Sequence, residues 1–123
     1  MLDDTEEQIR KILIEVASQK TAISYSQLNA QAPLHLDLDM PNDRVYLNHL
    51  LGDISEYEHG RDRPLLPALV VHGKGPQKGK PDKAFFELGE ELGRYKSEAD
   101  KTEWLKLEQN HLYEEWETGV VRD

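Results

Sequence analysis

The sequence contains no cysteine, which excludes disulfides, thiolate zinc sites and cysteine nucleophiles. It has no apolar run as long as a membrane-spanning helix, and residues 1–20 lack the basic start and apolar stretch of a secretory signal. The glycines of residues 73–80 do not have the spacing of a phosphate-binding loop, because no Gly-Lys-Ser/Thr sequence precedes a helix. We therefore expect a cytoplasmic protein that binds no membrane and no cofactor.

Charge is plentiful and unevenly distributed. The 123 residues carry 24 acidic and 15 basic side chains, which gives a net charge of −9. The two ends, residues 1–40 and 84–123, carry −4 and −6, whereas residues 41–83 carry +1. Affinity for nucleic-acid phosphates comes mainly from clustered Lys and Arg, so both ends of the chain would repel DNA.

Apolar residues at helical spacing predict three helices before residue 61. The expected starts are Asp4 or Thr5 for the first helix, Ser24 with Gln27 as a capping box for the second, and Asn42 or Asp43 for the third, which ends at Gly60. The residues expected on the buried face of the third helix are Val45, Leu47, Leu50, Leu51, Ile54 and Tyr57.

The second half of the chain predicts a β-hairpin and a last helix. Leu65–Val71 is the strongest candidate strand, residues 73–83 form a mobile Gly/Pro/Lys loop, and residues 84–86 return as a second strand. The last helix is expected over about residues 97–117, starting at Ser97. The residues expected to be buried together are Leu50, Leu66, Leu69, Val70, Phe86 and Trp104.

This order of elements predicts one α+β domain over residues 1–123, with a winged-helix-like core at about residues 5–92. The third helix would be the recognition helix and the hairpin would be the wing. The C-terminal helix is an addition that covers the core or forms a homodimer.

Three segments resemble the C-terminal winged-helix domain of the alkylguanine-DNA alkyltransferases and the alkyltransferase-like proteins. They are Ile23–Leu28, Arg44-Val45 and Pro64–Val71. The resemblance places the acceptor cysteine of that family at Ala68, which has no nucleophile. It therefore implies a winged-helix fold without alkyl transfer.

A second resemblance is to short uncharacterised bacterial proteins with the pattern RPLLxALVV followed by FFxLxxxLG. Residues 63–71 and 85–93 fit this pattern. The resemblance implies that the domain is a recurring bacterial unit and carries no implication of an activity.

Two surfaces are candidate binding sites. Arg and Asn are the residue types that contact base edges, and lysines in a flexible loop contact phosphates. The candidate nucleic-acid surface is Arg44, Asn48, His49, Lys74, Lys78, Lys80 and Lys83. The candidate protein-binding surface lies on the last helix and comprises Glu114, Glu115, Trp116 and Glu117.

The histidines do not predict a metal or catalytic site. His35, Asp37 and Asp39 alternate with leucines, and a loop with its polar side chains in solvent explains them better than a cation site. His59 follows the third helix and is expected to be a surface residue at a helix C-terminus. No partner is evident for His72 or His111.

The sequence therefore predicts a non-catalytic module. The favoured function is binding of a basic protein partner, such as a toxin, a nuclease or another nucleic-acid enzyme, in the manner of an immunity, antitoxin or accessory protein. The alternative is a DNA-binding regulatory or architectural protein that uses the third helix and the lysine loop.

Overall fold

The computed structural model describes residues 2–96 and 98–123. The helices are α1 (Asp4–Ser18), α2 (Tyr25–Gln31), α3 (Pro41–Gly60), the short 3₁₀ helix η1 (Leu66–Leu69), α4 (Lys83–Glu91) and α5 (Lys101–Glu115). Two short strands, β1 (Ile23–Ser24) and β2 (Val70–Val71), pair in parallel. The chain is thus mainly helical with one small parallel sheet. In the described residues, no helix has the length and apolar character needed to cross a bilayer.

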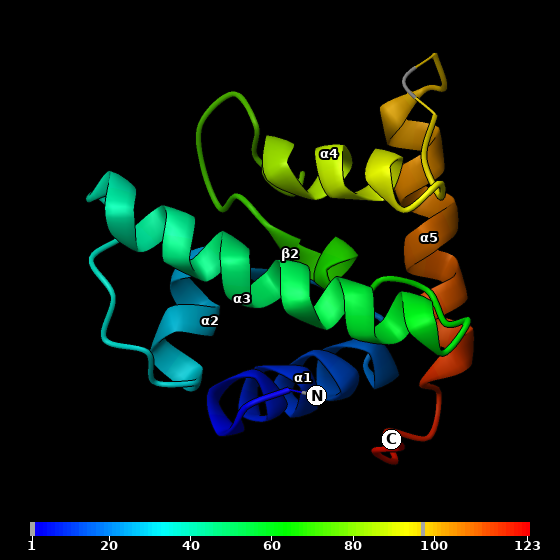
Figure 1. Ribbon diagram of the computed structural model, residues 1–123, viewed down its shortest axis with the longest axis horizontal. Helices are drawn as coiled ribbons and strands as arrows, with labels where there is room; N and C mark the ends of the chain where they lie inside the picture. The colour runs from blue at the N-terminus through cyan, green and yellow to red at the C-terminus, as the bar shows by residue number, and fades with distance from the viewer. Residues whose placement is uncertain (1, 97) are drawn as a thin grey trace.

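The helices enclose η1 and the sheet. Figure 1 shows α3 crossing the front of the molecule, with α1 below it, α4 above it and α5 upright at one end. α1, α3 and α5 all pack against η1. Consequently Leu65, Leu66, Ala68, Leu69 and Val70 have no exposed surface.

The first two helices begin at capping boxes. At α1 the box is formed by Asp3 and Glu6, whose side chains accept hydrogen bonds from each other's backbone N–H groups. α1 therefore begins with Asp3 as its N-cap, one residue before the earliest expected cap. The predicted box of Ser24 and Gln27 at α2 is confirmed.

The prediction of a strand over Leu65–Val71 is wrong for most of its length. Only Val70–Val71 is extended, and Leu66–Leu69 forms η1. A strand at Leu66–Leu69 would need ladder partners on both sides, and Pro67 has no N–H to donate. Three helices instead surround this segment, and the backbone carbonyl of Ala68 accepts a hydrogen bond from the Gln109 side chain on α5 (3.0 Å).

The predicted wing is also wrong. Residues 84–86 lie in α4, for which the Asp82 side chain is the N-cap. In the described residues the only sheet is the parallel pair β1–β2, so the expected antiparallel hairpin is not formed. Phe85 and Phe86 pack as a helical pair against Trp104, with ring centroids 5.7 and 6.1 Å apart from it. This aromatic contact with α5 favours the helix.

Most of the predicted core is confirmed. Leu50, Leu66, Leu69, Val70 and Phe86 are buried, whereas Trp104 is half-buried and its indole N–H donates to the Arg94 carbonyl oxygen. The last helix begins at Lys101 with Asp100 as its N-cap. The expected start, Ser97, lies outside the described residues.

A buried ion cluster joins α1 to α3 and to the segment before η1. The Glu58 carboxylate has no exposed surface and accepts from Arg10 Nε at 2.8 Å and from Arg63 Nε at 2.9 Å. Both guanidinium groups lie 5.3 Å from the centroid of the Trp116 ring. One carboxylate therefore balances two buried cations that share an aromatic neighbour.

Replacing Glu58 with Gln is expected to destabilise the protein by about 3–5 kcal/mol. The change removes the only carboxylate in this cluster and leaves two buried guanidinium groups without a counter-charge. Urea denaturation followed by circular dichroism measures the loss. The matched control is Glu56→Gln, an exposed position on the same helix, which should change stability by less than about 0.5 kcal/mol. Equal effects of the two variants would contradict this account of the cluster.

Candidate functional site

A cleft of about 300 Å³ lies between the start of α2, the first half of α3 and the loop that follows β2. Its lining residues are Tyr25, Ser26, Leu38, Asp39, Arg44, Leu47, Asn48, His72, Gly73, Lys74 and Asp82. The cleft thus has a polar floor. Its charged lining includes Arg44 of α3, Lys74 of the loop after β2 and Asp39 of the 33–40 loop.

Asp82 organises the floor of the cleft. Its carboxylate accepts from Asn48 Nδ2 at 3.3 Å and lies 3.2 Å from His72 Nε2. Its backbone N–H donates to the Tyr25 hydroxyl at 2.7 Å. The same carboxylate caps α4 through the Ala84 N–H. Asp82 therefore ties the start of α4 to α3 and to the end of the sheet through its side chain, and to α2 through its backbone N–H.

Tyr25 remains protonated in this setting. Burial raises the pKa of its hydroxyl group well above the usual value, with the Asp82 charge adding to the effect. Its ring centroid lies 4.9 Å from that of His72. Because the hydroxyl oxygen already accepts from the Asp82 N–H, the hydroxyl proton is left to donate into the cleft. The arrangement supplies hydrogen-bonding groups and charges, which suits binding.

The sequence did not indicate Tyr25, His72 and Asp82 as a group. Asp82 does carry a local signal, since it precedes the apolar residues Phe85, Phe86 and Leu88 at helical spacing, as an N-cap does. Because residues 84–86 were expected to form a strand, Asp82 was not predicted to be a helix N-cap. His72 has Asp82 and Tyr25 as its neighbours, so the expectation that it has no partner is wrong.

The predicted nucleic-acid residues do not form one surface. Arg44, Asn48 and Lys74 line the cleft, where the Arg44 guanidinium donates to the Leu38 carbonyl oxygen at 3.0 Å. His49 lies outside the cleft on the exposed face of α3.

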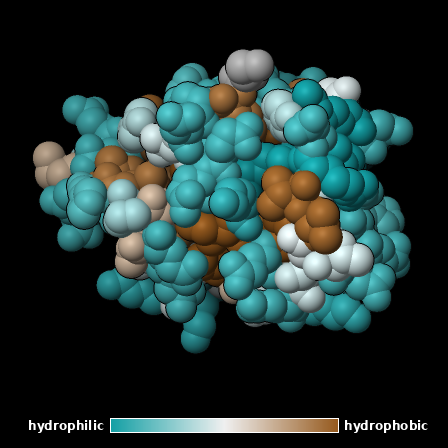
Figure 2. Space-filling model, turned by 90° about the horizontal axis from the view of Figure 1, so that it is seen from below, coloured by the Kyte–Doolittle hydropathy of each residue, from teal (hydrophilic) through white to brown (hydrophobic). Residues whose placement is uncertain are grey.

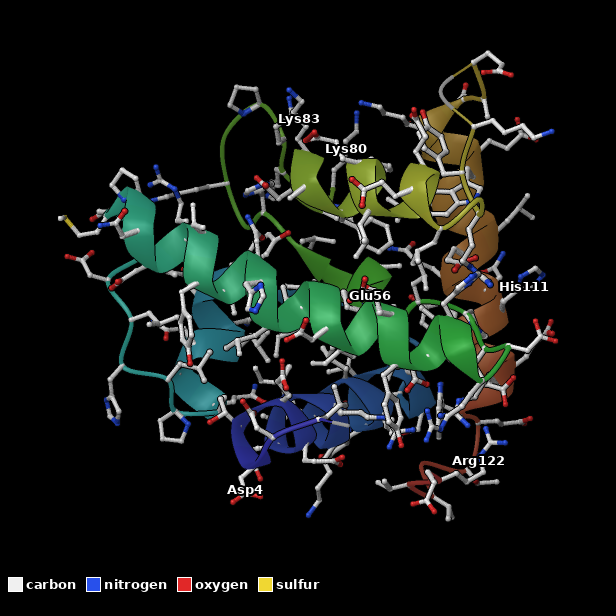
Figure 3. The ribbon with its side chains drawn as sticks, in the orientation of Figure 1. Asp4, Glu56, Lys80, Lys83, His111 and Arg122 are labelled. Atoms are coloured by element: carbon white, nitrogen blue, oxygen red, sulfur yellow. The ribbon has the colours of Figure 1, made fainter. Side chains whose placement is uncertain are left out.

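The remaining lysines lie elsewhere. Lys78 and Lys80 line a separate groove beside α5. Lys83 is the first residue of α4, and Figure 3 shows it near Lys80 on the side of the molecule opposite Asp4.

The predicted protein-binding surface on α5 loses its aromatic residue. Trp116 is 1% exposed and lies beneath Arg10 and Arg63, so it belongs to the core and cannot contact a partner. Glu115 is paired with Arg122. Glu114 and Glu117 are exposed, as expected.

An exposed apolar patch lies instead at the start of α3. Met40, Val45 and Tyr46 are 53%, 67% and 48% exposed, and we call these three residues the α3 patch. Val45 was expected in the core. In Figure 1 the first turns of α3 extend past the ends of α1 and α4. Figure 2 shows a largely hydrophilic face with several separate hydrophobic areas, near its middle as well as toward one end.

The loop that precedes α3 has its own internal bonds. The backbone N–H of Asp37 donates to the Asp43 carboxylate, and that of Asp39 donates to the Asp37 carboxylate. Within residues 2–96 and 98–123, no three His, Asp or Glu side chains are placed to hold a metal ion. The polar residues of the loop thus serve its turns and the start of α3.

A pair of carboxyl groups lies beneath the outer face of α3. Glu6 on α1 is 4% exposed, and its carboxyl group lies close enough to that of Asp53 on α3 for the two to interact. Burial and the interaction with Asp53 raise the pKa of Glu6 from 4.5 to about 7. Asp53 is also 3.6 Å from the exposed His49.

The stability of the protein is expected to fall between about pH 5 and pH 8 through Glu6. The folded protein keeps the Glu6 carboxyl proton to a higher pH than the unfolded chain does. The contribution of Glu6 to the free energy of unfolding is therefore complete below pH 4.5 and is lost as pH rises through about 7. Glu6→Gln keeps the capping acceptor and removes the titration. Denaturation should be measured at pH 5 and at pH 8. At pH 8 only, the free energy of unfolding of Glu6→Gln should exceed that of the wild type by up to about 3 kcal/mol. Glu15→Gln, at an exposed position of α1, should follow the wild type.

The segments that resemble the alkyltransferases have defined places in this fold. Ile23–Leu28 forms β1 and the first turn of α2, and Arg44 lies in the first turn of α3. Ala68, at the position of the acceptor cysteine, is fully buried in η1. No protein-family model, curated protein or solved structure matches this chain.

Proposed function

We propose that this chain is a non-catalytic module that binds a basic protein partner through the α3 patch. The observation that carries the proposal is the exposure of Val45, which is 67% accessible on a helix whose next turns are buried. Burying an apolar side chain of this size stabilises a protein by about 1.5–3 kcal/mol relative to leaving it in water. Met40 and Tyr46 are also exposed apolar residues at the start of α3, so this end of the helix is the candidate surface for a partner.

The charges around the α3 patch favour a basic partner. Apart from the buried Glu58, the acidic residues of the preceding loop and of α3 are Asp37, Asp39, Asp43, Asp53 and Glu56. A partner that presents an apolar residue between Lys or Arg side chains would complement this surface in shape and in charge. The exposed Glu114 and Glu117 add to a negative field that speeds association at low salt. A toxin, a nuclease or another nucleic-acid enzyme has the required basic surface.

The outer face of α3 is unsuited to reading DNA. Arg44 and Asn48 are engaged in the cleft, with the Leu38 carbonyl oxygen and the Asp82 carboxylate. The exposed side of α3 carries the α3 patch and the Glu56 carboxylate, and the partly exposed Asp53 carboxylate lies beside His49. The carboxylates would repel phosphates, and the apolar side chains offer phosphates no hydrogen bond, so protein binding is the better-supported function of this helix.

The proposal includes the absence of alkyl transfer. The side chain at the acceptor position, Ala68, has no nucleophilic atom and lies in the core. A cysteine introduced there would be buried among α1, α3 and α5. Binding without chemistry is consistent with the hydrogen-bonding groups that the cleft presents.

The double variant Val45→Ser/Tyr46→Ser is expected to lose the protein partner while remaining folded. Tagged wild type and variants are used to capture proteins from the organism that encodes the chain, and each captured protein is then purified and titrated against them. For the true partner the double variant should bind at least about 10-fold more weakly, because central apolar contacts dominate interfaces. Unfolding temperatures should stay close to that of the wild type, since both side chains are exposed.

The matched control is Leu107→Ser, which changes an apolar residue of α5 that is 53% exposed. It should leave partner affinity unchanged. It also tests the homodimer expected through the C-terminal helix, because loss of self-association in this variant alone would place a dimer at α5. A partner that binds the double variant as tightly as the wild type would refute the role of the α3 patch.

A further inference from the structure

A groove of about 330 Å³ lies between the loop after β2, α4 and the first half of α5. Its lining residues are Lys78, Gly79, Lys80, Phe86, Lys101, Thr102, Leu105, Lys106 and Gln109. Four of these are lysines and none is acidic, in a chain with 24 acidic and 15 basic residues. The groove is thus a local concentration of positive charge on a strongly negative protein.

The fold brings these lysines together from two distant segments. Lys78 and Lys80 come from the loop, and Lys101 and Lys106 come from α5. Among the described residues, no ion pair includes any of the four. The Lys101 ammonium group lies 5.2 Å from the centroid of the Phe86 ring, which forms part of the floor. Like charges placed together without counter-charges repel one another, and a bound polyanion would remove this repulsion.

Backbone hydrogen bonds hold the loop in its shape. The His72 N–H donates to the Lys80 carbonyl oxygen at 2.9 Å, and the Gly79 N–H donates to the His72 carbonyl oxygen at 2.8 Å. Gly79 has a φ of +82°, a backbone conformation that residues other than glycine rarely adopt. The two loop lysines therefore have a fixed position at the rim, facing α5, even though their side chains remain in solvent.

We propose that this groove binds the phosphates of a single nucleic-acid strand. Two lysines of the loop and two of α5 line this groove together with the apolar Phe86 and Leu105, and an extended strand bound in it would bring its phosphates to cations from both segments. Thr102 and Gln109 add uncharged hydrogen-bonding groups. The Phe86 ring is 6% exposed and beneath Lys101, so it offers no stacking platform. Recognition is therefore of the backbone, independent of sequence and dependent on salt.

This site differs from the one that the sequence indicated. The expected surface combined the loop with the α3 residues Arg44, Asn48 and His49. The groove replaces them with Lys101 and Lys106, which lie on α5. The inference does not depend on the protein partner proposed for the α3 patch, since the two surfaces share no residue.

The test is a titration of a fluorescein-labelled oligo(dT) strand of about 20 nucleotides by fluorescence anisotropy, over a series of salt concentrations. The wild type should bind at low salt, with log affinity falling linearly against log salt. Lys80→Gln/Lys106→Gln removes one cation from each side of the groove. It should reduce the slope by about 1.4, because each lost phosphate contact to a single strand accounts for about 0.7.

The control Lys11→Gln/Lys20→Gln lowers the net charge by the same two units at exposed positions on or just after α1. It should keep the wild-type slope. Equal losses in the two double variants would overturn the proposal, because binding would then follow net charge and not the groove. Absence of wild-type binding at low salt would also overturn it. Tighter binding of duplex DNA or of a poly-glutamate peptide of equal charge, with the same dependence on Lys80 and Lys106, would assign the groove to that ligand instead.

Discussion

The buried Glu58 carboxylate is the interaction on which the arrangement of the helices depends. A carboxylate taken out of water needs counter-charges and hydrogen-bond donors in place, and here they come from Arg10 on α1 and Arg63 before η1. Trp116, at the end of α5, packs against both guanidinium groups. Glu58 therefore joins α1, α3 and the segment before η1 directly, and α5 joins them through the contacts of Trp116 with the two arginines.

A second buried carboxylate, that of Glu108, likewise bonds to the segment before η1. Glu108 on α5 is 5% exposed and accepts from the Leu65 N–H at 2.9 Å and from Arg94 Nε at 3.1 Å. With Glu58 it fixes both flanks of residues 63–65, which feed directly into η1. The surface follows from this core: α3 is anchored through its C-terminal half, so its first turns project and expose the α3 patch. β2 likewise sets the start of the loop that faces α5.

The local features of the chain were determined by the sequence alone. The helix over Asp4–Ser18, the capping box of Ser24 and Gln27, and the third helix ending at Gly60 all follow from side chains within a few residues of one another. Caps and apolar periodicity act over one or two turns, so neighbouring residues suffice to predict them. The lack of cysteine and the excess of acid are likewise properties of composition.

Tertiary contacts decided the remaining features. A short apolar run such as 65–71 fits a buried strand or a buried 3₁₀ turn equally well, and three surrounding helices selected the latter. The helix over Phe85 and Phe86 is favoured by their ring contacts with Trp104 on α5 and with Tyr95 in the segment between α4 and α5. Apolar periodicity also cannot show where a helix extends beyond the helices packed against it. Nor can it show that the loop lysines share a groove with Lys101 and Lys106 of α5. These outcomes depend on contacts between residues far apart in the chain, which only the folded arrangement brings together.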